Sequence, residues 1–152
     1  MMSFDSDRTL PDLSGSVGLR CVRVSQAHHI WEGEVDRSAG PVQIDWSDGS
    51  VVLLEVRSDW TMRVTLGPWV DYYKDASAEE REVLSVEVGL WVLEDHSDVD
   101  PARDFIGRTL KGIEDISNEA DELVGLFFVF GAAALYVFAW GGEPVMERGP
   151  AE

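Results

Sequence analysis

Apolar and polar residues alternate most clearly between positions 42 and 66. Residues 42–46 alternate, Asp48-Gly49 follows, and residues 51–56 form an apolar run. Asp-Gly between two such segments is typical of a β-hairpin, because glycine tolerates the positive φ that the turn needs. A second alternating segment, residues 60–66, comes next. The pattern predicts a three-stranded antiparallel meander over 42–66.

The second half of the chain carries weaker signals for both helix and strand. Ser77 and Glu80 have the spacing of a capping box, which predicts a short helix over 78–82. Apolar residues at every second position from 84 to 92 predict a strand directly after it. An Asp-Pro pair suits the first turn of a second short helix, over 101–106. Further strands are expected at 19–25, 28–35, 108–117 and 143–147.

The uncharged run LVGLFFVFGAAALYVFAW, residues 123–140, decides the class of the protein. As a helix, it would span about 27 Å, close to the roughly 30 Å hydrocarbon core of a membrane. Its flanks oppose that interpretation, because acidic residues precede it and the nearest basic residues are Lys111 and Arg148. Both halves are rich in β-branched and aromatic residues, with small residues at 131–134 between them. We therefore expect a buried β-hairpin and no membrane insertion.

These elements predict an α+β fold that is mainly antiparallel β. The expected architecture is a curved sheet, arranged as a half-barrel or a sandwich built from hairpins, with one or two short helices. A chain of 152 residues suits a single domain. We expect a flexible N-terminal arm over 1–18, the β-rich domain over 19–147 and a frayed C-terminus over 148–152.

Charge is the most unusual property of the composition. The formal net charge is −17, and residues 94–122 alone hold ten acidic against three basic residues. Such a field disfavours direct nucleic-acid binding and anionic membranes, and it attracts basic partners. The single cysteine, Cys21, leaves no intramolecular disulfide and no cysteine-based zinc site. The N-terminal stretch has neither the basic residues nor the apolar core of a signal peptide, so we expect a cytoplasmic location.

Catalytic and metal-binding signatures are weak. The sequence has no Gly-x-Ser-x-Gly, His-Glu-x-x-His or Gly-x-Gly-x-x-Gly motif. His28, His29 and His96 raise the question of a metal site, but neighbouring residues on a strand point to opposite faces. The aspartates between 95 and 104 lack the spacing of an EF-hand, so a solvated acidic loop is the simpler interpretation. We therefore expect no cofactor, no metal and, on balance, no enzymatic activity.

The sequence favours a protein that binds a basic macromolecular partner, such as a bacterial immunity or antitoxin-type inhibitor of a toxin. The acidic loop would steer the encounter, and an aromatic segment would anchor the complex. The expected contact residues are Glu94, Asp95, Asp98, Asp100, Asp104, Trp69, Asp71, Tyr72 and Tyr73. Two alternatives remain open. One is a small-molecule-binding or enzymatic barrel with a pocket lined by Trp31, Trp46, Trp60 and Trp91; the other is a structural subunit that forms a homodimer through an apolar sheet face.

Overall fold

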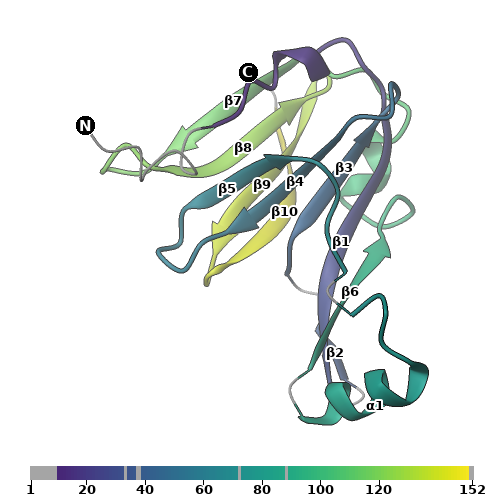
Figure 1. Ribbon diagram of the computed structural model, residues 1–152. Helices are drawn as coiled ribbons and strands as arrows, with labels where there is room; N and C mark the ends of the chain where they lie inside the picture. Colours follow the sequence, from purple (N-terminus) through teal and green to yellow (C-terminus); the bar gives the residue numbers. More distant parts are fainter. Residues whose placement is uncertain (1–9, 33, 37–38, 72, 88, 151–152) are drawn as a thin grey trace.

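Two open antiparallel sheets, both built from hairpins, pack face to face around the core (Figure 1). The computed structural model describes residues 10–150 except 33, 37, 38, 72 and 88. The larger sheet runs in the order β2-β1-β3-β4-β5, with β6 paired to β1, and the smaller one runs β10-β9-β8-β7. Together with one short α-helix among the described residues, this confirms the predicted mainly antiparallel α+β class.

The predicted meander and the predicted apolar hairpin are both confirmed. β3 (Val42–Trp46), β4 (Val51–Val56) and β5 (Met62–Leu66) pair consecutively. Gly49, with φ of +88°, donates its N–H to the Trp46 carbonyl at 3.0 Å in the Asp-Gly turn. The uncharged run forms β8 (Leu123–Val129) and β9 (Ala133–Trp140).

In this hairpin, side chains on one face fill the core. Leu126, Phe128, Leu135 and Val137 are fully buried, as alternation along paired strands requires. None of the helices among the described residues has the length and apolarity to cross a membrane.

Aromatic rings from both sheets meet at the centre of the core. The Trp46 ring of the larger sheet lies 6.2 Å from Phe128 and 6.4 Å from Phe130, measured between ring centroids. The Phe105 ring packs on Phe130, with 5.1 Å between ring centroids. Phe105 belongs to a 3-10 helix, Ala102–Phe105, which occupies most of the predicted second helix. Residues 10–18 of the expected arm also contact the body: Leu13 is buried beside a 3-10 helix, Ser14–Ser16.

The prediction of a strand over 84–92 is wrong. The helix α1 (Ala78–Glu87) extends through most of it, and β6 (Leu90–Asp95) begins only after Gly89. The capping box forms as expected, with the Glu80 N–H bonded to Ser77 Oγ at 3.0 Å and the Ser77 N–H bonded to Glu80 Oε1 at 3.3 Å. Gly89 ends the helix, because it adopts a φ of +86° and its N–H reaches the Leu84 carbonyl at 2.8 Å.

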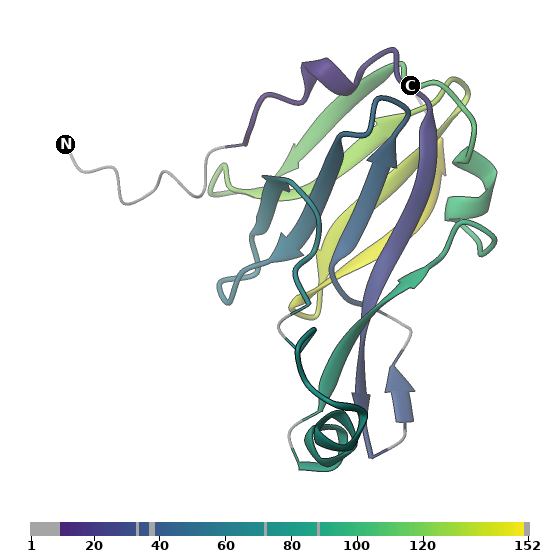
Figure 2. The ribbon, with the colours of Figure 1, turned by 45° about the vertical axis from the view of Figure 1, so that its right-hand side comes forward.

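The prediction of two separate strands at 19–25 and 28–35 is also wrong. One long strand, β1 (Cys21–Trp31), covers most of both, and β2 (Glu34–Asp36) is short. The first half of β1 pairs with β3, and its second half lies between β2 and β6. We call the paired strands β1 and β6 the β1–β6 ribbon; Figures 1 and 2 show it leaving the sandwich, with β2 and α1 at its far end.

The remaining strands complete the smaller sheet. β7 (Gly112–Ser117) occupies the second half of the predicted 108–117 strand, and its pairing with β8 shifts register between Ile116 and Ser117. β10 (Glu143–Pro150) is the predicted edge strand. It extends three residues beyond position 147, into the part of the chain where fraying was expected.

Candidate functional site

The carboxylates of the predicted acidic loop are mostly engaged with nearby residues. Asp95 Oδ1 accepts the Ser97 N–H at 2.8 Å, and the Ser97 hydroxyl and N–H together hold the pKa of Asp95 below its ordinary value. Asp100 Oδ1 lies 2.9 Å from Arg103 Nη2, and Asp104 forms an ion pair with Arg148.

Of the five predicted loop residues, Glu94 faces two histidines and Asp98 is exposed. Arginine side chains therefore offset the charge of two of the five, Asp100 and Asp104.

The predicted aromatic segment runs from β3 to α1. The Trp69 N–H donates to Gln43 Oε1 at 2.8 Å. Arg81 of α1 donates to Asp71 Oδ2 at 3.2 Å and also to the Tyr73 carbonyl. The Tyr73 N–H, with a smaller contribution from the Arg81 guanidinium, lowers the pKa of Asp71. Tyr72 lies outside the described residues. Asp71 and Tyr73 thus lie beside α1, which precedes β6, whereas Trp69 lies against β3.

A group of exposed apolar side chains surrounds the end of the β1–β6 ribbon. Val83 and Val86 of α1 are 50% and 53% exposed, and Trp31 of β1 is 51% exposed. The Trp31 Nε1–H donates to the Val86 carbonyl at 3.0 Å, which holds the indole against the helix. A shallow groove here is lined by Glu79, Glu82, Val83, Val86 and Glu87. We call these five residues and Trp31 the α1 surface.

Sequence reasoning missed the α1 surface because it assigned Val86 to a buried strand face. The useful signal was the capping box, since a capped start favours continuation of the helix through the glutamates that follow. Among α1 residues whose burial is described, only Arg81 and Leu84 are half-buried; the rest are exposed. The helix therefore rests on the ribbon through little of its surface.

The four tryptophans proposed as a pocket lining do not all lie together. Trp46 is buried in the core, whereas Trp31 and Trp60 are more than half exposed. Trp91 packs against His29, with 5.2 Å between ring centroids. The open sheets and the burial of Trp46 in the core give no support to a barrel with a pocket shared by all four tryptophans.

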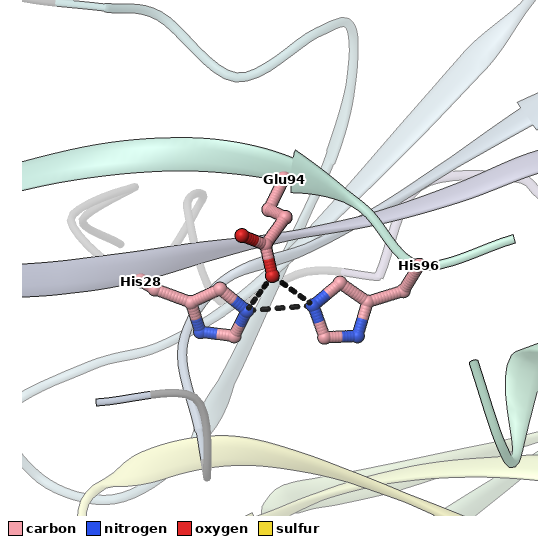
Figure 3. A group of neighbouring side chains, drawn as sticks. All are labelled: His28, Glu94 and His96. Atoms are coloured by element: carbon pink, nitrogen blue, oxygen red, sulfur yellow. Dashed lines mark hydrogen bonds and ion pairs between the residues drawn. The ribbon is translucent and has the colours of Figure 1, made fainter. Parts of the chain in front are cut away.

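Two buried histidines and one glutamate converge where β6 ends (Figure 3). His28 Nε2 and His96 Nε2 are 2.7 Å apart, and the two side chains are only 1% and 7% exposed. Glu94 Oε1 lies 3.8 Å from His28 Nε2 and 3.4 Å from His96 Nε2. One ligand atom from each residue lies within 4.8 Å of the others, which makes this the metal-compatible group of the described residues.

Strand register explains how these three side chains meet. His28 pairs with Val92 and Gln26 pairs with Glu94, so the side chains of His28 and Glu94 lie on the same face of the ribbon. The residues directly before and after His28 lie on the opposite face of β1. His96 follows β6 and donates its N–H to the Val24 carbonyl at 2.8 Å, which continues the pairing. The expectation that His28 and His29 point apart is confirmed, because His29 packs on Trp91. What sequence reasoning missed is the contact between His28 and a histidine 68 residues away.

A cleft of about 360 Å³ opens beside the cluster. Its lining combines polar and apolar groups: Gln26, Glu94, His96, Val99, Asp100, Pro101 and Met146. The Gln26 side chain is fixed by a hydrogen bond from its Nε2–H to the Gly40 carbonyl at 3.1 Å. Two of the three cluster residues, Glu94 and His96, therefore border space that a small ligand can enter.

The α1 surface and the His28–Glu94–His96 cluster are two separate candidate sites, at opposite ends of β6. The first offers apolar area within a negative rim, and the second offers two imidazoles and a carboxylate. Comparison of this chain with protein-family models, with curated proteins and with solved structures found no match.

Proposed function

We propose that this protein is a non-catalytic binding protein that recognises a basic partner protein through the α1 surface. The observation that carries the proposal is the half-exposure of Val83 and Val86 on a helix whose neighbouring side chains are glutamates. Trp31 adds a large aromatic side chain to the same surface. Aromatic anchors surrounded by charged groups are common at the centre of protein interfaces.

The helix itself supports a partner at this position. A ten-residue helix is marginal in water on its own, and helices in proteins gain most of their stability by packing one face. α1 leaves two valines half-exposed, and valine is a weaker helix former than leucine or alanine. Covering the exposed halves of these valines would contribute about 1 kcal/mol each to association.

Charge defines the chemistry of the partner. Glu79, Glu82 and Glu87 line the groove, and Arg81, the basic residue within α1, contacts Asp71 and Tyr73. A lysine- or arginine-rich segment with apolar residues complements this surface. The overall charge of −17 would accelerate the encounter at low salt, and the acidic loop of Glu94–Asp104 remains a proposed secondary contact.

A more specific version of this proposal is an immunity or antitoxin-type inhibitor that neutralises a basic toxin in the bacterial cytoplasm. What supports it is the combination of small size, strong acidity and the absence of catalytic motifs from the sequence. A neighbouring reading frame for a basic toxin, whose product binds the purified protein, would strengthen this version. Neighbouring genes without such a product would remove it while leaving the general proposal in place.

A designed peptide tests the general proposal. The probe is a fluorescent amphipathic peptide of alternating lysine and leucine blocks, and binding is measured by anisotropy between about 20 and 300 mM salt. We expect saturable binding that weakens steeply with salt, because exposed charges are screened at these concentrations. Two comparison peptides, oligolysine and a glutamate-leucine analogue, should bind more weakly. Equal binding of oligolysine would contradict a role for the valines.

Matched variants assign the binding to this surface. Val86→Ser should weaken binding of the probe several-fold, whereas Val22→Ser, at a 49% exposed valine of β1, should not. Glu82→Gln should reduce the salt dependence, and Glu119→Gln provides the control at an exposed glutamate outside α1. If both members of each pair behave alike, binding is a general effect of charge and the proposal fails.

A homodimer is the second candidate, and one observation favours it. On the face of the smaller sheet opposite the core, Phe127, Tyr136 and Phe138 form a row of stacked rings, with centroid distances of 4.4 and 4.3 Å. Trp140, on the same strand, is 73% exposed. Light scattering at micromolar concentration tests this candidate: a dimer that Trp140→Ser converts to a monomer supports it, and a monomeric wild type removes it.

A further inference from the structure

We infer that His28, Glu94 and His96 form a binding site for a divalent first-row transition metal, with zinc as the best match. This inference is independent of the proposed partner surface, because the cluster lies at the other end of β6. It assigns a role to two buried histidines that the α1 surface does not use.

The geometry of the three ligand atoms fits one small cation. Zinc binds imidazole nitrogen and carboxylate oxygen at about 2.0–2.2 Å, which places neighbouring ligand atoms of a tetrahedron roughly 3.4 Å apart. The three separations here, 2.7, 3.4 and 3.8 Å, fall on both sides of that value. A small rotation of either imidazole would therefore bring all three atoms to bonding distance from one point.

The types of the ligands narrow the choice of ion. Imidazole nitrogen suits zinc, iron, nickel and copper, whereas calcium and magnesium prefer sites made of oxygen atoms. Two histidines with one carboxylate is a set used by open zinc sites and by non-haem iron sites. Cys21, the only thiol, lies in the hydrophobic core, so a thiolate site for a softer ion is not built here.

Burial prepares the two histidines for this role. His28 lies on β1 and His96 directly follows β6, both with little exposure, so the fold orders the two side chains before a metal binds. Glu94 is 40% exposed and closes the cluster from the solvent side. The carboxylate would balance part of the charge of the cation, which lowers the cost of placing it beside buried groups.

Three protein ligands leave one position of a tetrahedral ion for another molecule. The adjoining cleft reaches His96 and Glu94, and Asp100 and Met146 also line it. Water or a small donor ligand is the expected occupant of that position, in the way that open zinc sites hold water. The site thus has the composition of an exchangeable metal site rather than of a closed four-ligand structural site.

The chain provides an internal control for the test. It has three histidines, and His29 is adjacent to His28 but points to the opposite face, against Trp91. His96→Gln and Glu94→Gln remove ligands, whereas His29→Gln changes the histidine content by the same amount and leaves the cluster intact. Glu94→Gln changes a partly exposed side chain, so its effect on folding should be small.

The probe is Co²⁺, whose visible absorption reports coordination directly, followed by competition with Zn²⁺. We expect one Co²⁺ per chain, with absorption bands typical of four-coordinate nitrogen and oxygen ligation, and displacement by a single equivalent of Zn²⁺. Glu94→Gln should weaken binding at least about tenfold, His96→Gln should abolish the bands, and His29→Gln should bind as the wild type does. Circular dichroism of each variant confirms that it is folded.

Two results would overturn the inference. The first is the absence of the bands in the wild type at millimolar Co²⁺, which would leave a hydrogen-bonded histidine pair as the description of the cluster. The second is equal binding by the wild type and folded His96→Gln, which would assign the metal to the acidic surface. Failure of the peptide-binding test affects neither result, so each proposal is tested independently of the other.

Discussion

The Trp31 Nε1–H donates a hydrogen bond of 3.0 Å to the carbonyl oxygen of Val86, and it links the end of β1 to the last turn of α1. That carbonyl is among the last of the helix, where backbone acceptors have no partner within the helix itself. The contact fixes an indole and an exposed valine side by side. It is the structural basis of the α1 surface.

Loss of this hydrogen bond should loosen α1 without unfolding the sandwich. Trp31→Phe keeps an aromatic ring and removes the donor, which costs about 1 kcal/mol locally. We expect faster amide hydrogen exchange in the last turn of α1, by about fivefold, and an unchanged rate in β8 and β9. Faster exchange throughout both sheets would show that α1 is coupled to the global fold, contrary to this description.

The capping box should control the first turn of the same helix. Ser77→Ala removes the acceptor of the Glu80 N–H and should destabilise α1 by about 1 kcal/mol. Ser77→Asp retains an acceptor at this position and should restore most of the loss. Hydrogen exchange of the α1 amides measures both effects. Equal exchange in the alanine and aspartate variants would indicate that the cap does not stabilise the helix.

Gly40 should be intolerant of any side chain. A Cβ there would lie 1.8 Å from the Ala27 carbonyl oxygen, and the residue has a φ of +148°. Gly40→Ala should therefore lower the free energy of unfolding by about 2 kcal/mol or more, as measured by urea denaturation. Gly112→Ala is the control, because no atom lies within 4 Å of the Cβ it would add. Similar midpoints for the two variants would contradict the close approach at Gly40.

Cys21 should be chemically inert in the native protein. Burial, with a smaller effect from the nearby charge of Asp45, raises the pKa of its thiol from 9.0 to about 12. The unfolded chain ionises at lower pH than the folded one, so this group stabilises the fold fully below about pH 8.5 and progressively less as pH rises toward 12. A thiol reagent at pH 8 should modify urea-unfolded protein rapidly and native protein very slowly. Rapid modification of native protein would show that residue 21 is accessible.

Local patterns in the sequence were sufficient to predict much of the fold. Asp48-Gly49 and the alternation around it determine the meander, and the acidic flanks with small residues at 131–134 identify the apolar hairpin. Each failure has its own cause. Alternation at 84–92 also fits a helix that is only lightly packed, and one long strand replaced two short ones because β2 and β6 pair with the second half of β1.

The candidate sites depended on long-range pairing and were therefore harder to predict. The aspartates at 95, 100 and 104 were expected to contact a partner, but Arg103 and Arg148 pair with Asp100 and Asp104, and Ser97 is hydrogen-bonded to Asp95. His28 and His96 come together only because β1 and β6 are neighbours, which no local pattern indicates. Charge and composition suggested the kind of partner, whereas pairing between distant strands determined where the surfaces lie.

The central claim, that a basic partner binds the α1 surface, is tested most directly by the ¹⁵N NMR spectrum of the protein during titration with the lysine-leucine peptide. Trp31 is informative because its indole N–H, one of six in the chain, gives its own signal and contacts α1. We predict saturable shifts of that indole signal and of amides 79–87 at low salt, with little change in β8 and β9. Saturable shifts confined to residues 94–104, or the absence of shifts at millimolar peptide, would contradict the account.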